Sequence, residues 1–179
     1  MVRRPSSIPS PARIRRLAFF RDFSPVEARR LARAGQLRDL LPGELLATEG
    51  TRKQRRILYV VTRGELQYVK RVRGERAQVF LRLPPGTVGG FLTFFNEAPS
   101  PVSVVSVGRT RVFELSQREF QLLAAENPPL AVKLLLALSR ETIRHLDHLL
   151  GQVAATSAWA LELAHHLAGL PIGAEPSGK

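Results

Sequence analysis

The 179-residue sequence predicts a mainly β protein with additional helices: an antiparallel sandwich or barrel, preceded by one helix and followed by a long one. Two observations support this fold class. Between residues 44 and 115, short runs rich in β-branched and aromatic residues begin about every 8–12 residues, which is typical of antiparallel sheets and not of βαβ units. After residue 127, apolar residues recur at alternating steps of four and three, which indicates a helix.

Local signals place the individual elements. Ser24-Pro25-Val26-Glu27 combines an N-cap, a first-turn proline and a Glu three residues after the Ser, and predicts a helix over residues 25–37. Ser116-Gln117-Arg118-Glu119 starts a short helix to about residue 125, and Asn127-Pro128 starts the longest one. The predicted strands cover residues 45–48, 57–62, 65–72, 78–83, 102–107 and 110–115.

The long helix carries an apolar seam of heptad type, weakened by Ser139 and Ser157. Such a seam predicts a homodimer, whereas a core helix packed on the sheet is the alternative. A break near residues 154–157 is expected, where Thr156 or Ser157 caps a final helix. The apolar members of the seam are Val132, Leu136, Ile143, Leu146, Leu150 and Val153.

These signals divide the chain into five segments. They are a disordered basic arm (1–16), a β domain (17–127), a dimerisation helix (128–153), a terminal helix (154–170) and a disordered tail (171–179).

The composition excludes several classes of protein. With no cysteine, the chain forms no disulfide, thiolate nucleophile or Cys-ligated metal site. The start is basic but continues with Pro and Ser, and no run of about 18 apolar residues occurs, so we expect a cytoplasmic protein without a transmembrane segment. No nucleophile motif, phosphate-binding NTPase loop or carboxylate pair is present, so we expect no enzymatic activity.

The net charge of +12 lies in the first half of the chain. Residues 1–40 carry ten Arg against three acidic residues, and residues 52–82 carry ten Lys or Arg against two Glu. This excess predicts an anionic partner, which is a protein, a nucleotide or a nucleic acid; a merely solvated surface is the alternative. The predicted basic patch consists of Arg52, Lys53, Arg55, Arg56, Lys70, Arg71, Arg73 and Arg76.

Short sequence stretches occur over about residues 17–150 in the order and spacing of a known family. They are Phe19-Phe20, Phe23-Ser24-Pro25-Val26-Glu27, Leu41-Pro42-Gly43-Glu44-Leu45, Leu58-Tyr59-Val60-Val61-Thr62-Arg63-Gly64-Glu65-Leu66, Leu83-Pro84-Pro85-Gly86-Thr87-Val88-Gly89, Phe113-Glu114-Leu115-Ser116 and Asn127-Pro128. Together they resemble the cyclic-nucleotide-binding domain of the catabolite activator protein (Crp/Fnr) family of bacterial regulators. The resemblance implies a β jelly roll with a phosphate-binding cassette, followed by a helix that covers the ligand and pairs protomers.

The cassette departs from the family pattern at both charged positions. In the family, a Glu accepts from the ribose 2′-OH and an Arg ten residues later neutralises the cyclic phosphate; here Gly90 and Ser100 fall at these positions. We therefore expect weak or no binding of cAMP and cGMP, through a cassette that is either degenerate or adapted to another ligand. Phe91, Phe94 and Phe95 line an apolar pocket or pack in the core. The candidate pocket residues are Gly89, Gly90, Phe91, Leu92, Thr93, Ser100, Pro101, Val102 and His145.

His145 enters this set because it falls eighteen positions after Asn127, where the family reads the base; a solvated His is the alternative. Its spacing from His148 is only a weak signal for a metal site, so no metal and no cofactor is predicted. A cyclic mono- or dinucleotide remains the alternative ligand.

Only 29 residues follow Leu150, too few for the family's winged helix-turn-helix of about seventy residues. The chain is then a sensor-only module or a truncated one.

Three functions remain open at this point. They are a dimeric sensor with an altered ligand, a protein-interaction scaffold with a lost ligand site, and a nucleic-acid-associated protein that acts through charge.

Overall fold

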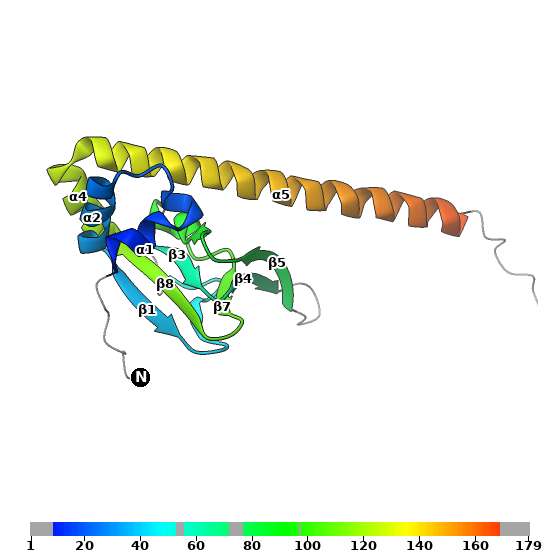
Figure 1. Ribbon diagram of the computed structural model, residues 1–179. Helices are drawn as coiled ribbons and strands as arrows, with labels where there is room; N and C mark the ends of the chain where they lie inside the picture. The colour runs from blue at the N-terminus through cyan, green and yellow to red at the C-terminus, as the bar shows by residue number, and fades with distance from the viewer. Residues whose placement is uncertain (1–8, 53–55, 72–76, 97, 169–179) are drawn as a thin grey trace, which may run out of the picture. The chain divides into compact units, whose positions relative to one another are not determined.

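The computed structural model describes residues 9–52, 56–71, 77–96 and 98–168 (Figure 1). The chain divides into two compact units, Met1–Thr142 and Ile143–Lys179. Within the part of the chain that is described, no helix is both long enough and apolar enough to cross a membrane.

The first unit contains two four-stranded antiparallel sheets, which confirms the predicted jelly roll of mainly β class (Figure 1). All six predicted strands are present, with ends within one residue of those expected; Val72 alone lies outside the described residues. One sheet has the order β1 (Gln36–Leu40), β8 (Thr110–Ser116), β3 (Ile57–Arg63) and β6 (Val88–Gly89). The other has the order β2 (Leu45–Ala47), β7 (Ser103–Ser106), β4 (Leu66–Arg71) and β5 (Ala77–Leu83).

The helices lie before, within and after this β structure. They are α1 (Pro11–Arg15), the 3₁₀ turn η1 (Ala18–Phe20), α2 (Pro25–Ala34), α3 (Phe91–Phe94), α4 (Gln117–Glu126) and α5 (Pro128–Ala168). The predicted capping box of α2 is present: Ser24 Oγ accepts from the Glu27 N–H, and Glu27 accepts from the Ser24 N–H. Ser116 likewise accepts from the N–H of Glu119 at the start of α4.

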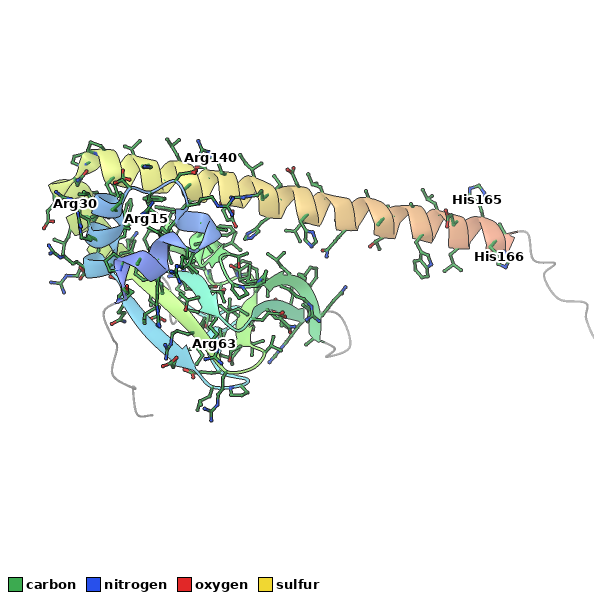
Figure 2. The ribbon with its side chains drawn as sticks, viewed as in Figure 1. Arg15, Arg30, Arg63, Arg140, His165 and His166 are labelled. Carbon is green, nitrogen blue, oxygen red and sulfur yellow. The ribbon has the colours of Figure 1, made fainter. Side chains whose placement is uncertain are left out.

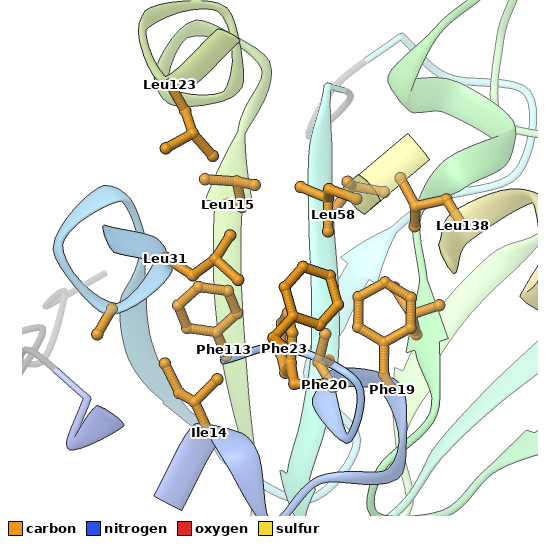
Figure 3. Packing of buried hydrophobic residues seen from close by; sticks show 14 of the residues in the cluster. Ile14, Phe19, Phe20, Phe23, Leu31, Leu58, Phe113, Leu115, Leu123 and Leu138 are labelled. Carbon is orange, nitrogen blue, oxygen red and sulfur yellow. The ribbon is translucent and has the colours of Figure 1, made fainter. Parts of the chain in front are cut away.

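Two apolar clusters form the core. The first joins the helices to the β1–β8–β3–β6 sheet, and Figure 3 shows its phenylalanine rings gathered together. The ring centroid of Phe20 lies 5.5 Å from that of Phe23 and 5.7 Å from that of Phe113. The second lies between the sheets and includes Val61, Leu66, Leu83, Val104 and Val112. Burial of each such side chain contributes about 1.5–3 kcal/mol.

The predicted disordered arm is wrong for residues 11–15, which form α1 (Figure 1). Ser10 O accepts from the N–H groups of Arg13 and Ile14, and Pro11 occupies the first helical position, where no N–H is needed. Ile14 is 1% exposed and packs in the first core cluster, so burial of one apolar side chain stabilises this short helix. Residues 1–8 of the predicted arm lie outside the described residues.

The helix predicted over residues 25–37 ends at Ala34, and the next residues form the edge strand β1. A Cβ on Gly35 would lie 2.2 Å from the Phe113 ring, so glycine allows β1 to approach β8 closely. The polar side chains of β1 find partners on β8. Arg38 lies 3.1 Å from Glu114, which is 5% exposed, and Arg111 lies 2.6 Å from Asp39.

The predicted break at residues 154–157, and with it a separate terminal helix over 154–170, is wrong. Helix α5 continues without interruption to Ala168, and Thr156 Oγ1 donates to the carbonyl of Gln152 instead of capping a new helix. A threonine hydroxyl satisfied in this way is compatible with a helix interior. The predicted tail, residues 171–179, lies outside the described residues.

Candidate ligand-binding cassette

The cassette begins where β6 runs antiparallel to β3, with Gly89 opposite Tyr59. Gly90 then adopts φ +87° and caps the short helix α3. Tyr68 reaches the same place from β4, which belongs to the other sheet. The candidate phosphate-binding backbone therefore lies between two tyrosine side chains, which are 4% and 6% exposed.

A hydrogen bond closes this end of the cassette. The Gly90 N–H donates to the Tyr68 hydroxyl at 3.1 Å, and the Tyr68 hydroxyl is also hydrogen-bonded to that of Tyr59. A backbone N–H at the start of a helix is the kind of donor that binds a phosphate oxygen. Here the acceptor of the Gly90 N–H is the Tyr68 hydroxyl oxygen.

The two glycines have no room for side chains. A Cβ on Gly89 would lie 2.4 Å from a Tyr59 ring carbon and 2.7 Å from the Tyr68 hydroxyl. A Cβ on Gly90 would lie 2.2 Å from the carbonyl oxygen of Ile57. The family's glutamate at this position would therefore collide with backbone.

Burial also keeps the tyrosine hydroxyls protonated. It raises the pKa of Tyr59 well above 10.0, and the interaction with Tyr68 raises it further. Burial likewise raises the pKa of Tyr68, although hydrogen bonds from Tyr59 and Gly90 counteract part of that effect. The pair stays neutral, so it acts as a hydrogen-bonding group and not as a counter-ion for an anionic ligand.

At the other end of the cassette, Ser100 is buried and satisfied by the backbone. Its hydroxyl donates to the Val102 carbonyl at 2.7 Å, and its N–H donates to the Thr51 carbonyl at 3.0 Å. Thr93, the other hydroxyl among the candidate pocket residues, donates to the Gly90 carbonyl at 3.3 Å within the cassette. Both hydroxyls are thus used internally.

A cation does lie beside this loop, but it is paired. Lys70 Nζ is 2.9 Å from Glu49 and donates to the Pro101 carbonyl at 2.9 Å. The Arg71 N–H donates to the other oxygen of Glu49; this bond and the one from Lys70 lower the pKa of Glu49. Lys70 therefore ties the cassette loop to β4 with its charge compensated.

The remaining pocket candidates separate by burial. Phe94 is fully buried in the first core cluster, so the core interpretation holds for it, and Phe91 is half-buried against the same cluster. Leu92 and Phe95 are exposed, Pro101 is exposed, and Val102 packs against the second cluster. Whether these side chains line one ligand pocket stays a prediction.

Four members of the predicted basic patch are described: Arg52, Arg56, Lys70 and Arg71. Lys70 serves the cassette loop, and the other three are exposed. Lys53, Arg55, Arg73 and Arg76 lie outside the described residues. Convergence of the patch on one face stays a prediction.

The seam residues of α5 are exposed in the single chain. In the first unit, Val132 and Leu136 are both 55% exposed, while Leu130, Ala131, Leu134 and Leu138 on the same helix are buried. In the second unit, Ile143, Leu146, Leu150 and Val153 are 54–61% exposed. The interpretation of the seam as a core-facing stripe is therefore wrong.

His145 lies in the second unit, and its role toward the cassette stays a prediction. It is half-buried, and burial lowers its pKa, as do the nearby charges of Arg144 and His148. Across the described residues, no group of three His, Cys, Asp or Glu is arranged to hold a metal ion.

Comparison with known proteins identifies the family. The model of the cyclic nucleotide-binding domain matches residues 37–127. The chain belongs to this family. The match confirms the resemblance found in the sequence, and it covers the whole cassette and all strand residues except Gln36. No curated protein sequence matches the chain.

Solved structures show the same fold. A cyclic nucleotide-binding domain from Methylobacillus flagellatus is 22% identical, with a TM-score of 0.71, over 81% of this chain and 80% of that one. The Thermus thermophilus catabolite activator protein is 23% identical, with a TM-score of 0.62, over 81% of this chain and 63% of that one. The regulatory domain of Toxoplasma gondii PKA, crystallised with cAMP, is 25% identical, with a TM-score of 0.53, over 63% of this chain and 42% of that one.

Sequence reasoning missed the tyrosine pair and the Glu49–Lys70 bridge. Tyr59 and Tyr68 are the only tyrosines of the chain, on consecutive strands of different sheets. Their position among inward-facing strand residues could have indicated burial, and a buried tyrosine hydroxyl requires a partner. That partner, the Gly90 N–H, is not identifiable from composition or spacing.

Replacing Gly90 by alanine tests the closed cassette against a matched position. Gly43 also has a positive φ, +74°, but nothing lies within 4 Å of a Cβ there. Gly43→Ala should therefore cost only the strain of the left-handed backbone, about 1–2 kcal/mol of unfolding free energy. Gly90→Ala should cost about 1–3 kcal/mol more, because the Cβ also meets the Ile57 carbonyl. Urea unfolding measures both values, and equal costs would contradict the packing described for Gly90.

The raised pKa values predict an alkaline transition. Because both tyrosines have pKa values above 10.0 in the folded chain, their contribution to stability is complete below pH 10 and is lost as the pH rises further. Tyrosinate absorbance should therefore stay low in the folded protein at pH 10.0, the ordinary pKa of tyrosine. At higher pH it should increase together with the unfolding seen by circular dichroism. The urea-unfolded chain is the control. Ionisation of both tyrosines near pH 10 in a folded protein would show that they are not buried.

Proposed function

We propose that this protein is a non-enzymatic, dimeric regulatory module of the cytoplasm whose cyclic-nucleotide cassette is closed by its own side chains. It then binds neither cAMP nor cGMP. The hydrogen bond from the Gly90 N–H to the buried Tyr68 hydroxyl carries this proposal. The regulatory class follows from membership of the family, and the closed state follows from the contacts of the cassette.

A cyclic phosphate would meet three obstacles. It would have to displace Tyr68 from Gly90, and an unsatisfied buried hydroxyl costs about 1–3 kcal/mol. It would find Ser100 where the family supplies a guanidinium group. Lys70 of β4, which contacts the cassette loop at Pro101, is already bound to Glu49.

The ribose would also lose its partner. The carboxylate that accepts from the 2′-OH in the family is absent at Gly90, and a side chain there would overlap the Ile57 carbonyl. Charge-assisted hydrogen bonds contribute about 1.5–3 kcal/mol each, so losing both charged partners weakens affinity by several orders of magnitude. These considerations support a module that does not respond to nucleotide.

Dimerisation is supported by the seam of α5. Six aliphatic side chains at alternating four- and three-residue spacing remain more than half exposed in the single chain. Exposed apolar residues at this spacing are typical of a two-stranded helical interface. The opposite face of the first part of α5 is already used by Leu130, Leu134 and Leu138, which pack in the core.

Isothermal calorimetry with cAMP and cGMP tests the closed cassette. We expect no heat of binding and no thermal stabilisation at millimolar nucleotide, since a ligand at 100 times its Kd adds about 2.7 kcal/mol. The Toxoplasma gondii regulatory domain, titrated in the same buffer, is a positive control. Binding of either nucleotide with a micromolar Kd would overturn this part of the proposal.

A charged residue in the seam tests the dimer. Leu150 is 56% exposed in the single chain, so Leu150→Arg should leave the fold intact while placing two like charges in the interface. Sedimentation should show a change from twice the chain mass to the 19.9 kDa of one chain. Val107→Arg, at a position 50% exposed on the β domain, is the matched control and should remain dimeric. A monomeric parent protein, or a dimer that Leu150→Arg leaves unchanged, would show that the seam does not form the interface.

A further inference from the structure

Helices α2 and α4 border a groove of about 440 Å³ on the first unit. Its lining includes aliphatic side chains that are open to solvent: Val26 of α2 is 52% exposed and Leu122 of α4 is 49% exposed. Exposed aliphatic side chains that line a concave surface are a common feature of protein-binding sites. The groove is separate from the cassette, because its lining includes neither the cassette glycines nor the two tyrosines.

The two walls of the groove carry opposite charges. Arg29, Arg30 and Arg33 line it from α2, and Glu119 and Glu126 line it from α4. Over the residues that the structure describes, none of these five side chains forms an ion pair, either across the groove or elsewhere. Figure 2 shows Arg30 on the outer side of α2, directed away from the β domain. Both walls thus present charges that are available to a partner.

We propose that this groove docks an acidic amphipathic helix of a partner protein. Its apolar stripe contacts Val26 and Leu122, and its acidic flank faces the three arginines of α2. Basic residues on its other flank face Glu119 and Glu126. A helix fits because its side chains at i, i+3, i+4 and i+7 form one apolar stripe with polar flanks, which matches a groove between two helices.

Nucleic acid fits this groove less well. A phosphate backbone would be attracted to α2 but repelled by Glu119 and Glu126. It would gain nothing from the exposed side chains of Val26 and Leu122. The second unit of another copy of this chain is also a poor occupant. Its described helical residues contain only two acidic residues, Asp147 and Glu162, and Asp147 lies between His145 and His148. A separate acidic protein is the better match to the charge pattern.

Selection from a displayed library of random peptides of about 16–20 residues tests the proposal on the full-length protein. Peptides are counter-selected against the Arg29→Glu, Arg30→Glu, Arg33→Glu triple variant. We expect enriched peptides with Asp or Glu beside an apolar stripe of helical spacing. A selection that enriches nothing over the counter-selecting variant, or that enriches basic peptides, would overturn the proposal.

The enriched peptide is then the probe for fluorescence anisotropy. Arg30→Glu and Leu122→Ser should each weaken its binding about tenfold or more, because the peptide contacts both the arginines of α2 and the exposed aliphatic side chains. Arg63→Glu is the matched control: Arg63 is exposed at the end of β3, outside the groove, and its replacement should change nothing (Figure 2). A peptide with Lys in place of its acidic residues should regain affinity for Arg30→Glu.

Two results would contradict the site. One is that Arg30→Glu and Leu122→Ser do not weaken peptide binding, as is expected only of the control Arg63→Glu. The other is binding of a DNA duplex that is lost with Arg30→Glu but kept with Leu122→Ser, which would assign the arginines to nucleic acid. Circular dichroism of each variant confirms that the fold is retained. Neither result depends on whether the cassette binds a nucleotide.

Discussion

The hydrogen bond between Tyr68 and Gly90 connects the sheets to the helices that surround them. It fixes the start of α3, and α3 places Phe94 in the first core cluster against Phe120 of α4, with ring centroids 5.7 Å apart. Gln117 Nε2 adds a hydrogen bond to the Phe94 carbonyl at 3.0 Å. The start of α3 is therefore part of the protein interior, and its displacement would disturb packing on both sides.

Helix α4 participates in both proposed features. Gln117 and Phe120 contact the cassette, whereas Glu119, Leu122 and Glu126 line the groove. Under the two proposals, the groove and not the cassette is the place at which another molecule adds binding free energy to α4. Only a partner that distinguishes two states of the domain then shifts their equilibrium.

The sequence was informative where local patterns determine structure and silent where distant partners do. Strands such as β3 and β8 were predicted because their β-branched residues lie between clear turn signals. Strand β1 was missed because its polar residues Arg38 and Asp39 find their partners, Glu114 and Arg111, more than 70 positions away. The loss of both charged cassette positions could be counted from the motif, but Tyr68, which accepts from the Gly90 N–H, comes from another sheet.

The structure also changes the interpretation of the net charge. Three basic side chains of the first half of the chain belong to ion pairs: Arg38 with Glu44 and Glu114, Lys70 with Glu49, and Arg82 with Glu65. The pairs that are open to solvent contribute at most about 1 kcal/mol each, but all of them reduce the charge available to a partner. The three arginines of α2 have no such compensation among the described residues, and they stand beside exposed aliphatic side chains. Charge that adjoins apolar surface favours a protein partner, because phosphates would use only the charge.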